Sequence, residues 1–298
     1  MEKKEIMKRL SLYKKILETK GYNVIYIGLY GSQNYNLDDD ESDIDVKAII
    51  MPTLHDIIFR KPTSKTIDCE KGAIDVKDLI TFYDVIRKGN FSYIESIQTE
   101  YSIGDKYIKE LFNQIKVNHK SVLGAMWEKR KALTHEYPSK TKEFEKWGFD
   151  PKQYHHIVRL QDILINLIYE DEEKNYSYFE YYGEMRQELI DIKRNKHNHT
   201  KEQVENWADG ILEHCEDIMP KDYKYEPINL DKEINDYIEK EIRLQLKNSD
   251  VSYAREIRTF DNGIPKKDLE KFPILENYKD KDVSYIVSES IEILWTNI

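Results

Sequence analysis

Hydrophobic and polar positions form short β-like runs in the N-terminal third of the chain and follow a helical period in most of the remainder. A first helix is predicted over residues 3–20, because apolar residues recur every three or four positions and Gly21 follows them. Short β-rich runs bounded by turn residues predict four strands, over residues 23–30, 43–50, 65–70 and 72–77. Further along, helices are predicted near 78–88, 105–117, 119–134, 151–170, 176–194, 200–217, 231–247 and 284–295.

This order of elements predicts an α+β protein, in which a small mixed sheet with flanking helices precedes a larger helical domain. We place a first domain over residues 1–115 and a helical domain over 116–298, within which 220–298 is an unassigned extension. Segment 248–280 contains glycine and prolines and little periodicity, so it is predicted to be rich in loops. No linker rich in Pro, Gly or Ser separates the two parts, so we expect them to pack tightly.

Composition narrows the class of protein. Lys and Arg number 46 against 56 Asp and Glu, and the net charge of −10 argues against a protein that coats nucleic acid without specificity. No apolar run approaches the roughly 18 residues that suggest a membrane span, and the charged N-terminus is unlike a secretory signal. Two cysteines, Cys69 and Cys215, exclude a disulfide scaffold and a cysteine-rich zinc site. We expect a cytosolic protein with no membrane partner.

A glycine-serine turn and a pair of aspartates carry the candidate chemistry. Gly31 and Ser32 form the turn, and Asp43 and Asp45 open the second predicted strand. Residues i and i+2 of a strand share a face, so the two carboxylates project together and repel unless a cation neutralises them. Such oxygen ligands favour Mg²⁺ or Mn²⁺. With Asp75 on a later strand as third carboxylate, the set suits two ions roughly 3.5–4 Å apart, a geometry used for phosphoryl or nucleotidyl transfer.

Two alternatives remain open for this segment. Six of the eight residues 38–45 are acidic, so an ordinary solvated loop also produces an Asp-x-Asp pattern. Asp68, in the preceding short strand, is a rival for the third carboxylate. In favour of a site, glycine lets a backbone approach a phosphate closely, and amides next to a serine hydroxyl bind anions.

The pattern of Gly-Ser, ten residues, Asp-x-Asp and a later strand Asp resembles the DNA polymerase β-like nucleotidyltransferase superfamily. Residues 30–37 and 41–47 are similar to predicted nucleotidyltransferases of phages and bacteria, some of them associated with RNA-repair operons. Stretches 88–95 and 150–160 also look similar, so the resemblance covers roughly residues 20–220. It implies transfer of a nucleoside monophosphate from an NTP to an acceptor hydroxyl, with release of pyrophosphate.

The resemblance also implies roles for single residues. Asp43 and Asp45 would hold two Mg²⁺ or Mn²⁺ ions, with Asp75 as third ligand and base for the acceptor hydroxyl. Gly31 and Ser32 would contact the triphosphate. One departure is Asn36, where family members often carry glycine; asparagine is the other residue that adopts the left-handed conformation most readily, so the turn is expected to survive.

A basic stripe is predicted on one helix face. Lys152, His156 and Arg159 follow i, i+4, i+7 spacing and would hold the β- and γ-phosphates, whereas His155 points about 100° away. Residues 116–160 hold ten Lys or Arg against five Asp or Glu, with Trp127 and other aromatics among them. Cations interleaved with aromatics suit RNA contact. The alternatives are a solvated helix face with a satisfied histidine, and tryptophans packed in the core.

Two weaker signals remain. Lys88, Asn90 and Glu95 resemble a supporting part of the site, although Gly-Asn is also a common helix-ending signal. The spacing of Arg194 and His199 matches a family of helical ribonucleases, but we interpret the segment as the polar end of a helix before an N-cap threonine at 200. No nearby cysteine or third histidine completes a metal site with the histidines there.

Three functions are therefore weighed. The first is an NTP-dependent nucleotidyltransferase whose acceptor is an RNA 3′ end. The second keeps the chemistry but attaches the nucleotide to a protein side chain, or cyclises it, in a toxin or defence setting. The third is a non-catalytic module that binds nucleotide or RNA. Metal-dependent release of pyrophosphate separates the third function from the first two.

Overall fold

The computed structural model describes residues 3–39, 42–137, 141–169 and 180–257 of the chain. Two compact units are present, one from Met1–Pro52 with Pro62–Leu230 and one from Thr53–Lys61 with Asp231–Ile298. The sequence suggested a division near residue 115. In the structure, the sheet and the helices that follow residue 115 belong to the same unit, and the second unit takes in a short insertion from the sheet region.

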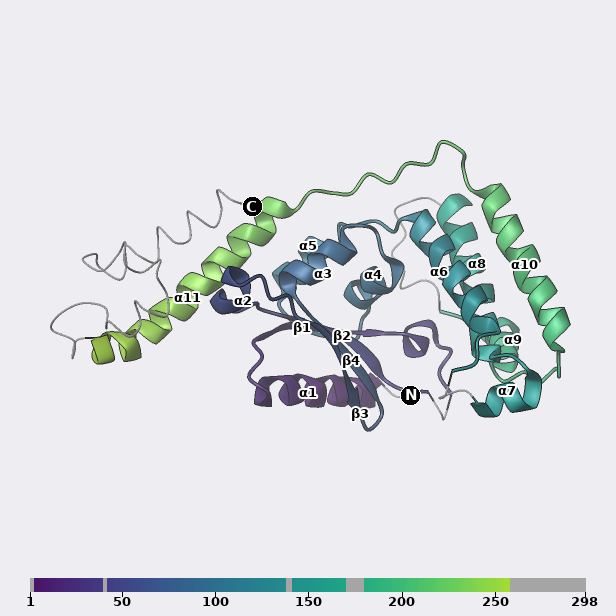
Figure 1. Cartoon of the computed structure of the whole chain (residues 1–298), viewed down its shortest axis with the longest axis horizontal. Helices are drawn as coiled ribbons and strands as arrows, with labels where there is room; N and C mark the ends of the chain where they lie inside the picture. Colours follow the sequence, from purple (N-terminus) through teal and green to yellow (C-terminus); the bar gives the residue numbers. More distant parts are fainter. Residues whose placement is uncertain (1–2, 40–41, 138–140, 170–179, 258–298) are drawn as a thin grey trace. The chain divides into compact units, whose positions relative to one another are not determined.

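Five strands form a mixed sheet in the first unit, and they confirm the predicted α+β class (Figure 1). They are β1 (Val24–Tyr30), β2 (Asp45–Ile50), β3 (Ser64–Cys69), β4 (Gly72–Asp78) and β5 (Ser102–Gly104). Their order is β3-β4-β2-β1-β5. β2 and β4 pair in parallel, and the other neighbours pair antiparallel. β5, three residues long, was not predicted.

Helix α1 (Lys3–Thr19) covers one face of this sheet, as its helical spacing predicted. Its buried stripe consists of Ile6, Leu10, Tyr13 and Leu17. These side chains belong to one apolar cluster with the inward-facing residues of β1, β2 and β4. Burial of apolar area of this kind is the main favourable term that fixes the helix on the sheet.

Helices α3 (Leu79–Ile86), α4 (Phe91–Gln98) and α5 (Lys106–Phe112) cover the opposite face, and Figure 1 shows them across the strands from α1. α4 was not predicted, and it lies unusually close to β1. A Cβ built on Gly28 would be 1.8 Å from the backbone oxygen of Ser96, so only glycine fits there. Tyr26 donates a hydrogen bond of 3.0 Å to the same oxygen. The close approach brings residues of α4 next to the Gly-Ser turn.

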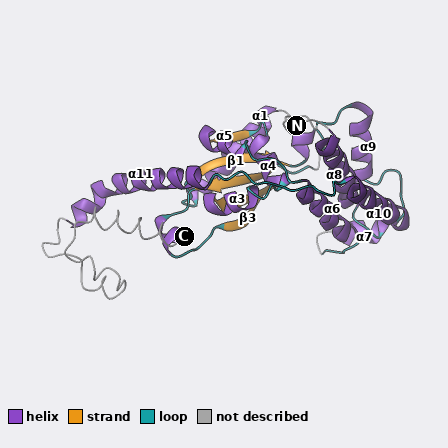
Figure 2. Cartoon of the chain, turned by 90° about the horizontal axis from the view of Figure 1, so that it is seen from above, coloured by secondary structure: helices purple, strands orange, loops and turns teal. Residues whose placement is uncertain are grey.

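The helical part of the first unit is built around α8 (Pro151–Tyr169), which packs against α6 (His119–Leu133), α9 (Gly183–Lys193) and α10 (Lys201–Ile218) (Figure 1 and Figure 2). A short helix, α7 (Thr141–Trp147), was not predicted. Arg130 of α6 donates two hydrogen bonds, 2.6 and 2.9 Å long, to Asp209 of α10. After α10 the chain returns to the sheet region, where the Leu230 amide donates to the Tyr83 hydroxyl at 2.8 Å. Residues 220–230, part of the unassigned extension, thus belong to the first unit.

The second unit contains α2 (Leu54–Ile58), which was not predicted, and α11 (Asp231–Ile257). Thr53 begins α2 with a capping box, since its hydroxyl accepts from the Asp56 amide and the Asp56 carboxylate accepts from the Thr53 amide. α11 starts where the sequence placed a helix and extends ten residues beyond the predicted end. The first residues of the helix predicted over 176–194, most of the loop-rich segment and the helix predicted over 284–295 lie outside the described residues.

Candidate functional site

The acidic pair lies where β2 begins. Asp43 is exposed and Asp45 is half-buried, and Asp45 accepts a 2.9 Å hydrogen bond from the Ala73 amide on β4. Burial raises the pKa of Asp45, and the neighbouring Asp43 carboxylate adds to that rise, while the charges of Lys152 and Lys47 oppose it. A cation between the two carboxylates would relieve their repulsion. Asp43 lies two residues before Asp45, just outside the strand. Carboxylate oxygens are ligands that a divalent ion combines with phosphate oxygens and water.

The Gly-Ser turn has the conformation that its sequence requires. Gly31 has φ 101° and ψ −155°, and a Cβ there would have no atom within 4 Å, so the space above the turn is open. Ser32 begins a 3₁₀ helix, η1 (Ser32–Tyr35), and Asn36 ends it in the left-handed conformation at φ 55°. The prediction that Asn36 preserves this turn is therefore confirmed. The Asn36 side chain also donates to the Tyr181 carbonyl at 2.9 Å.

Glu95 of α4 holds this turn from inside the protein. Its carboxylate accepts a hydrogen bond of 2.5 Å from the Gly31 amide and one of 3.1 Å from the Asn34 side chain. Glu95 is 7% exposed, and burial raises its pKa while the charge of Arg159 lowers it. The supporting role expected for Glu95 thus has a geometric basis. Because the Gly31 amide is already paired, the hydroxyl of half-buried Ser32 is the donor of this turn that remains nearest to solvent.

Asp75 has the partners of a buried ion pair. Its carboxylate lies 3.1 Å from Lys47 Nζ and 3.4 Å from Lys77 Nζ, and it accepts a 3.0 Å hydrogen bond from the Tyr93 hydroxyl. Burial alone would raise the pKa of Asp75, but the two lysine charges and these hydrogen bonds lower it overall. In the parallel ladder, Asp75 is registered with Lys47, two residues beyond Asp45.

The structure therefore does not assemble the three-carboxylate set. Within the described ranges, no group of three or more His, Cys, Asp or Glu side chains is arranged to hold a metal ion. The rival Asp68 is exposed on β3, in register with Ala73 of β4. Since β4 lies between β2 and β3, Asp68 is two strand spacings, roughly 10 Å, from Asp45. Neither Asp75 nor Asp68 joins Asp43 and Asp45 in such a group.

The residues of the basic stripe predicted on α8 differ in their exposure to solvent. Lys152 is exposed, and its charge acts on Asp45. Arg159 is only 8% exposed, and its guanidinium carbon lies 4.0 Å from the centre of the Tyr35 ring. The charge of Arg159 acts on Glu95, which holds the Gly-Ser turn, and the buried Nη1 of Arg159 has no hydrogen-bond partner among the described residues. Burial lowers the pKa of His156 well below its ordinary value, and its Nδ1 has no hydrogen-bond partner in the described part of the chain.

Three further cations gather near Lys152. The Lys193 ammonium at the end of α9 is 3.2 Å from Asp39 and donates to the Ser42 hydroxyl at 3.1 Å. Arg194 donates to the same Asp39 carboxylate at 2.7 and 3.1 Å. Burial lowers the pKa of Lys129 on α6, and the charges of Arg159 and Lys152 lower it further. Sequence reasoning missed Lys193 and considered Arg194 only in the ribonuclease pattern, because no local signal places the end of α9 against the acidic loop.

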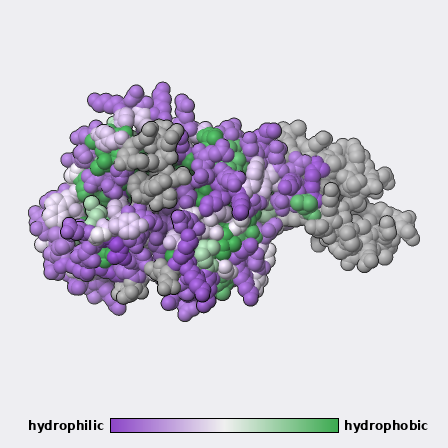
Figure 3. All heavy atoms as spheres, turned by 180° about the vertical axis from the view of Figure 1, so that it is seen from behind, coloured by the Kyte–Doolittle hydropathy of each residue, from purple (hydrophilic) through white to green (hydrophobic). Residues whose placement is uncertain are grey.

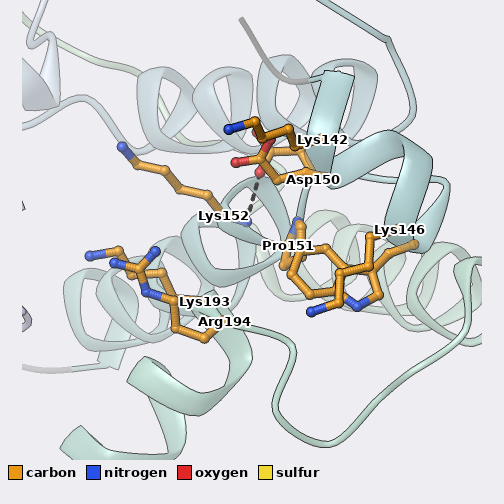
Figure 4. Close-up of a pocket in the computed structure, with 9 residues that line it drawn as sticks. Lys142, Lys146, Asp150, Pro151, Lys152, Lys193 and Arg194 are labelled. Atoms are coloured by element: carbon orange, nitrogen blue, oxygen red, sulfur yellow. Dashed lines mark hydrogen bonds between the residues drawn. The ribbon is translucent and has the colours of Figure 1, made fainter. Parts of the chain in front are cut away.

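Lys152, Lys193 and Arg194 border a pocket of about 220 Å³ between α7, α8 and the end of α9 (Figure 4). It is lined by Lys142, Glu143, Lys146, Trp147, Asp150, Pro151, Lys152, Lys193 and Arg194. The side chains of Lys152, Lys193 and Arg194 point the same way in Figure 4, away from Lys146. Among the described residues, Lys142, Lys146 and Lys152 have no ion-pair partner. Unpaired cations that share a pocket favour binding of an anion.

The weaker signals have local structural explanations. Asn90 caps α4, accepting from the Ser92 amide at 3.2 Å. Thr200 caps α10 with a capping box, as predicted, and His199 packs edge-on against Trp207 at 4.8 Å. Trp127 is 40% exposed and donates to Glu216 at 3.0 Å, so it is not a core residue.

Neither a scan against models of known protein families nor a search of curated proteins finds a match for this chain. The fold class and the site geometry are therefore known from the sequence and structure of this chain alone. On the face shown in Figure 3, hydrophilic side chains predominate and apolar ones form small patches. Of the helices in the described ranges, none combines the length and apolarity that crossing a bilayer requires.

Proposed function

We propose that this chain is a metal-dependent nucleotidyltransferase that moves a nucleoside monophosphate from an NTP to an acceptor hydroxyl. The main observation for this function is that an aspartate at the start of β2 lies close enough to a lysine of α8 for the opposite charges to interact. Asp43 and Asp45 begin β2, and the exposed Lys152 acts on Asp45 from a helix that lies more than a hundred residues later. Carboxylates for a cation beside unpaired cations for an anion suit a metal-bound polyphosphate. The resemblance of the Gly-Ser and Asp-x-Asp motifs to polymerase β-like enzymes supports the same function.

In the proposed reaction, the acceptor oxygen forms a bond to the α-phosphorus, and the bond from that phosphorus to the pyrophosphate oxygen breaks. The hydroxyl proton is released to solvent water. A Mg²⁺ or Mn²⁺ ion held by Asp43 and Asp45 would offset negative charge on the triphosphate. Lys152, which has no ion-pair partner among the described residues, is the side chain that would neutralise the β- and γ-phosphates. Glu95, through the Gly31 amide, fixes the turn above which the triphosphate would lie.

We propose RNA as the acceptor. The pocket beside the acidic pair presents Lys142 and Lys146, and the Lys146 ammonium lies 4.4 Å from the centre of the Trp147 ring. A cation next to an aromatic face is suited to a phosphate and a stacked base of a single strand. The pairing of Asp75 with lysines favours a second candidate, a module that binds nucleotide or RNA without transfer.

A labelling experiment tests the proposal. Purified chain is incubated with Mg²⁺ or Mn²⁺, each α-³²P-labelled NTP in turn and total RNA. The Asp43→Asn/Asp45→Asn variant is run in parallel, with Asp68→Asn as a matched control because that carboxylate is exposed and distant from the pair. Label in RNA with wild type and Asp68→Asn, but not with the double variant, supports RNA nucleotidyl transfer. Label in protein or in a cyclic product would show that RNA is not the acceptor. NTP binding without any transfer supports the second candidate.

A further inference from the structure

Lys47 is a buried lysine on the same strand face as the acidic pair. It follows Asp45 by two residues on β2, so both side chains project to one side of the sheet. Lys47 is 5% exposed, and its Nζ lies 4.0 Å from the centre of the Tyr30 ring and 4.2 Å from that of Tyr93. Two aromatic faces and a carboxylate around one ammonium stabilise it in place. Burial lowers the pKa of Lys47 and the charge of Asp75 opposes that effect, so these partners hold the ammonium next to Asp45.

Both oxygens of the carboxylate next to this ammonium already have partners. Oδ2 of Asp75 lies 3.1 Å from Lys47 Nζ and accepts from the Tyr93 hydroxyl at 3.0 Å, and Oδ1 lies 3.4 Å from Lys77 Nζ. An ion that bound Asp75 would have to displace lysine charges that are themselves buried, with Lys77 12% exposed and Lys47 6% exposed at the side chain. Leaving such ammoniums without their carboxylate is costly. Lys47 also acts on Asp45, so its charge reaches both carboxylates.

We propose that this site works with one divalent ion, held by Asp43 and Asp45, and that the Lys47 ammonium stands where a second ion would otherwise lie. This inference rests on the proposed function. Asp75 is then a positioning residue that holds Lys47, and not a metal ligand. The arrangement gives the site a second cation that comes from the protein and not from bound metal.

Mn²⁺ binding, measured without nucleotide by the electron paramagnetic resonance of the free ion, tests this directly. Wild type is expected to bind one Mn²⁺ per chain, and Asp45→Asn is expected to weaken that binding at least tenfold. Lys47→Met removes the ammonium and keeps the carboxylate, so the expected stoichiometry rises from one to two. Lys47→Met/Asp75→Asn removes the pair together, avoids an unpaired buried carboxylate and is expected to return the stoichiometry to one.

Lys65→Met is the matched control, because Lys65 is exposed on β3 and lies 4.6 Å from the centre of the Tyr22 ring, away from Asp75. Its stoichiometry should stay at one. A merely structural role for Lys47 would not create a second binding site. Two ions bound by wild type, no ion bound by wild type, or a stoichiometry of one in folded Lys47→Met overturns the one-ion proposal. Absence of both NTP binding and transfer, with these stoichiometries as expected, would instead reject the proposed function.

Discussion

Glu95→Gln tests whether one buried carboxylate holds the Gly-Ser turn. The substitution keeps the size of the side chain but removes its charge, so the Gly31 amide loses a charged acceptor and the buried Arg159 loses a nearby negative charge. A hydrogen bond to a charged acceptor is worth about 1.5–3 kcal/mol. The amide oxygen of glutamine still accepts one hydrogen bond, worth about 1 kcal/mol. Burial raises the pKa of Glu95, so its ionised form already bears a desolvation cost that the variant does not carry. We expect a net loss of about 0.5–2 kcal/mol in the free energy of unfolding.

Urea unfolding followed by circular dichroism measures this loss. Glu100→Gln is the control, because that carboxylate pairs with Lys3 at the surface, with 67% of its side chain exposed, and no measurable change is expected. In an NTP-binding assay, Glu95→Gln should weaken binding at least tenfold, while Glu100→Gln should not. Wild-type stability in Glu95→Gln would refute the reasoning that this carboxylate holds the turn. A stability loss with unchanged NTP binding would show that the turn does not contact nucleotide.

Three further predictions concern packing, RNA contact and pH. Gly28→Ala should lower the free energy of unfolding by about 3 kcal/mol or more, because the added Cβ would overlap the α4 backbone. Gly124→Ala, which has open space on α6, should raise it by about 0.5–1 kcal/mol in the same urea assay. Lys142→Ala/Lys146→Ala should weaken single-stranded RNA binding and reduce the slope of log K against log salt by about 1.4, measured by fluorescence anisotropy. Burial lowers the pKa of His155 from 6.5 to about 3. Its contribution to stability is therefore complete above pH 6.5 and should fall by about 1.4 kcal/mol per unit as pH drops toward 3, a slope that His155→Gln removes in urea titrations. Equal effects of the two glycine substitutions, an unchanged salt slope, or equal pH dependence in wild type and His155→Gln would contradict these expectations.

The sheet and the long helices were predictable because their signals are local. Alternation and helical spacing survive in sequence wherever a single face is buried, as in α1. α4 was missed because Gly89 and Asn90 are typical of the end of one helix, and here Asn90 also caps the next. β5 is too short to show a period. The glycine at position 28 is required by the close approach of the Ser96 carbonyl oxygen on α4, and the sequence alone does not reveal that approach.

The site was predictable in part for the same reason. The two-residue spacing of Asp43 and Asp45 predicted a shared strand face. In the structure β2 begins at Asp45, and Asp43 lies just before it, close enough for its charge to raise the pKa of Asp45. Spacing gave the direction of Arg159 on its helix but not its burial, which depends on Tyr35 and Glu95 from the sheet region. Lys193 could not be found, since its contact with the acidic loop joins residues about 150 positions apart.

Burial separates the charges that serve the protein from those available to a ligand. Asp75 is paired with Lys47 and Lys77 inside the protein, and the buried Glu95 is reached by the charge of Arg159. Asp43, just before β2, and Lys152 on α8 are exposed, and the charge of Lys152 reaches Asp45. Under the proposed function, these exposed side chains are the ones available to a substrate that carries a metal ion and phosphates. The same reasoning explains why motif spacing alone overcounts ligands: it identifies charged residues on a shared face, and the packing of α4 and α8 decides which of them remain free to bind.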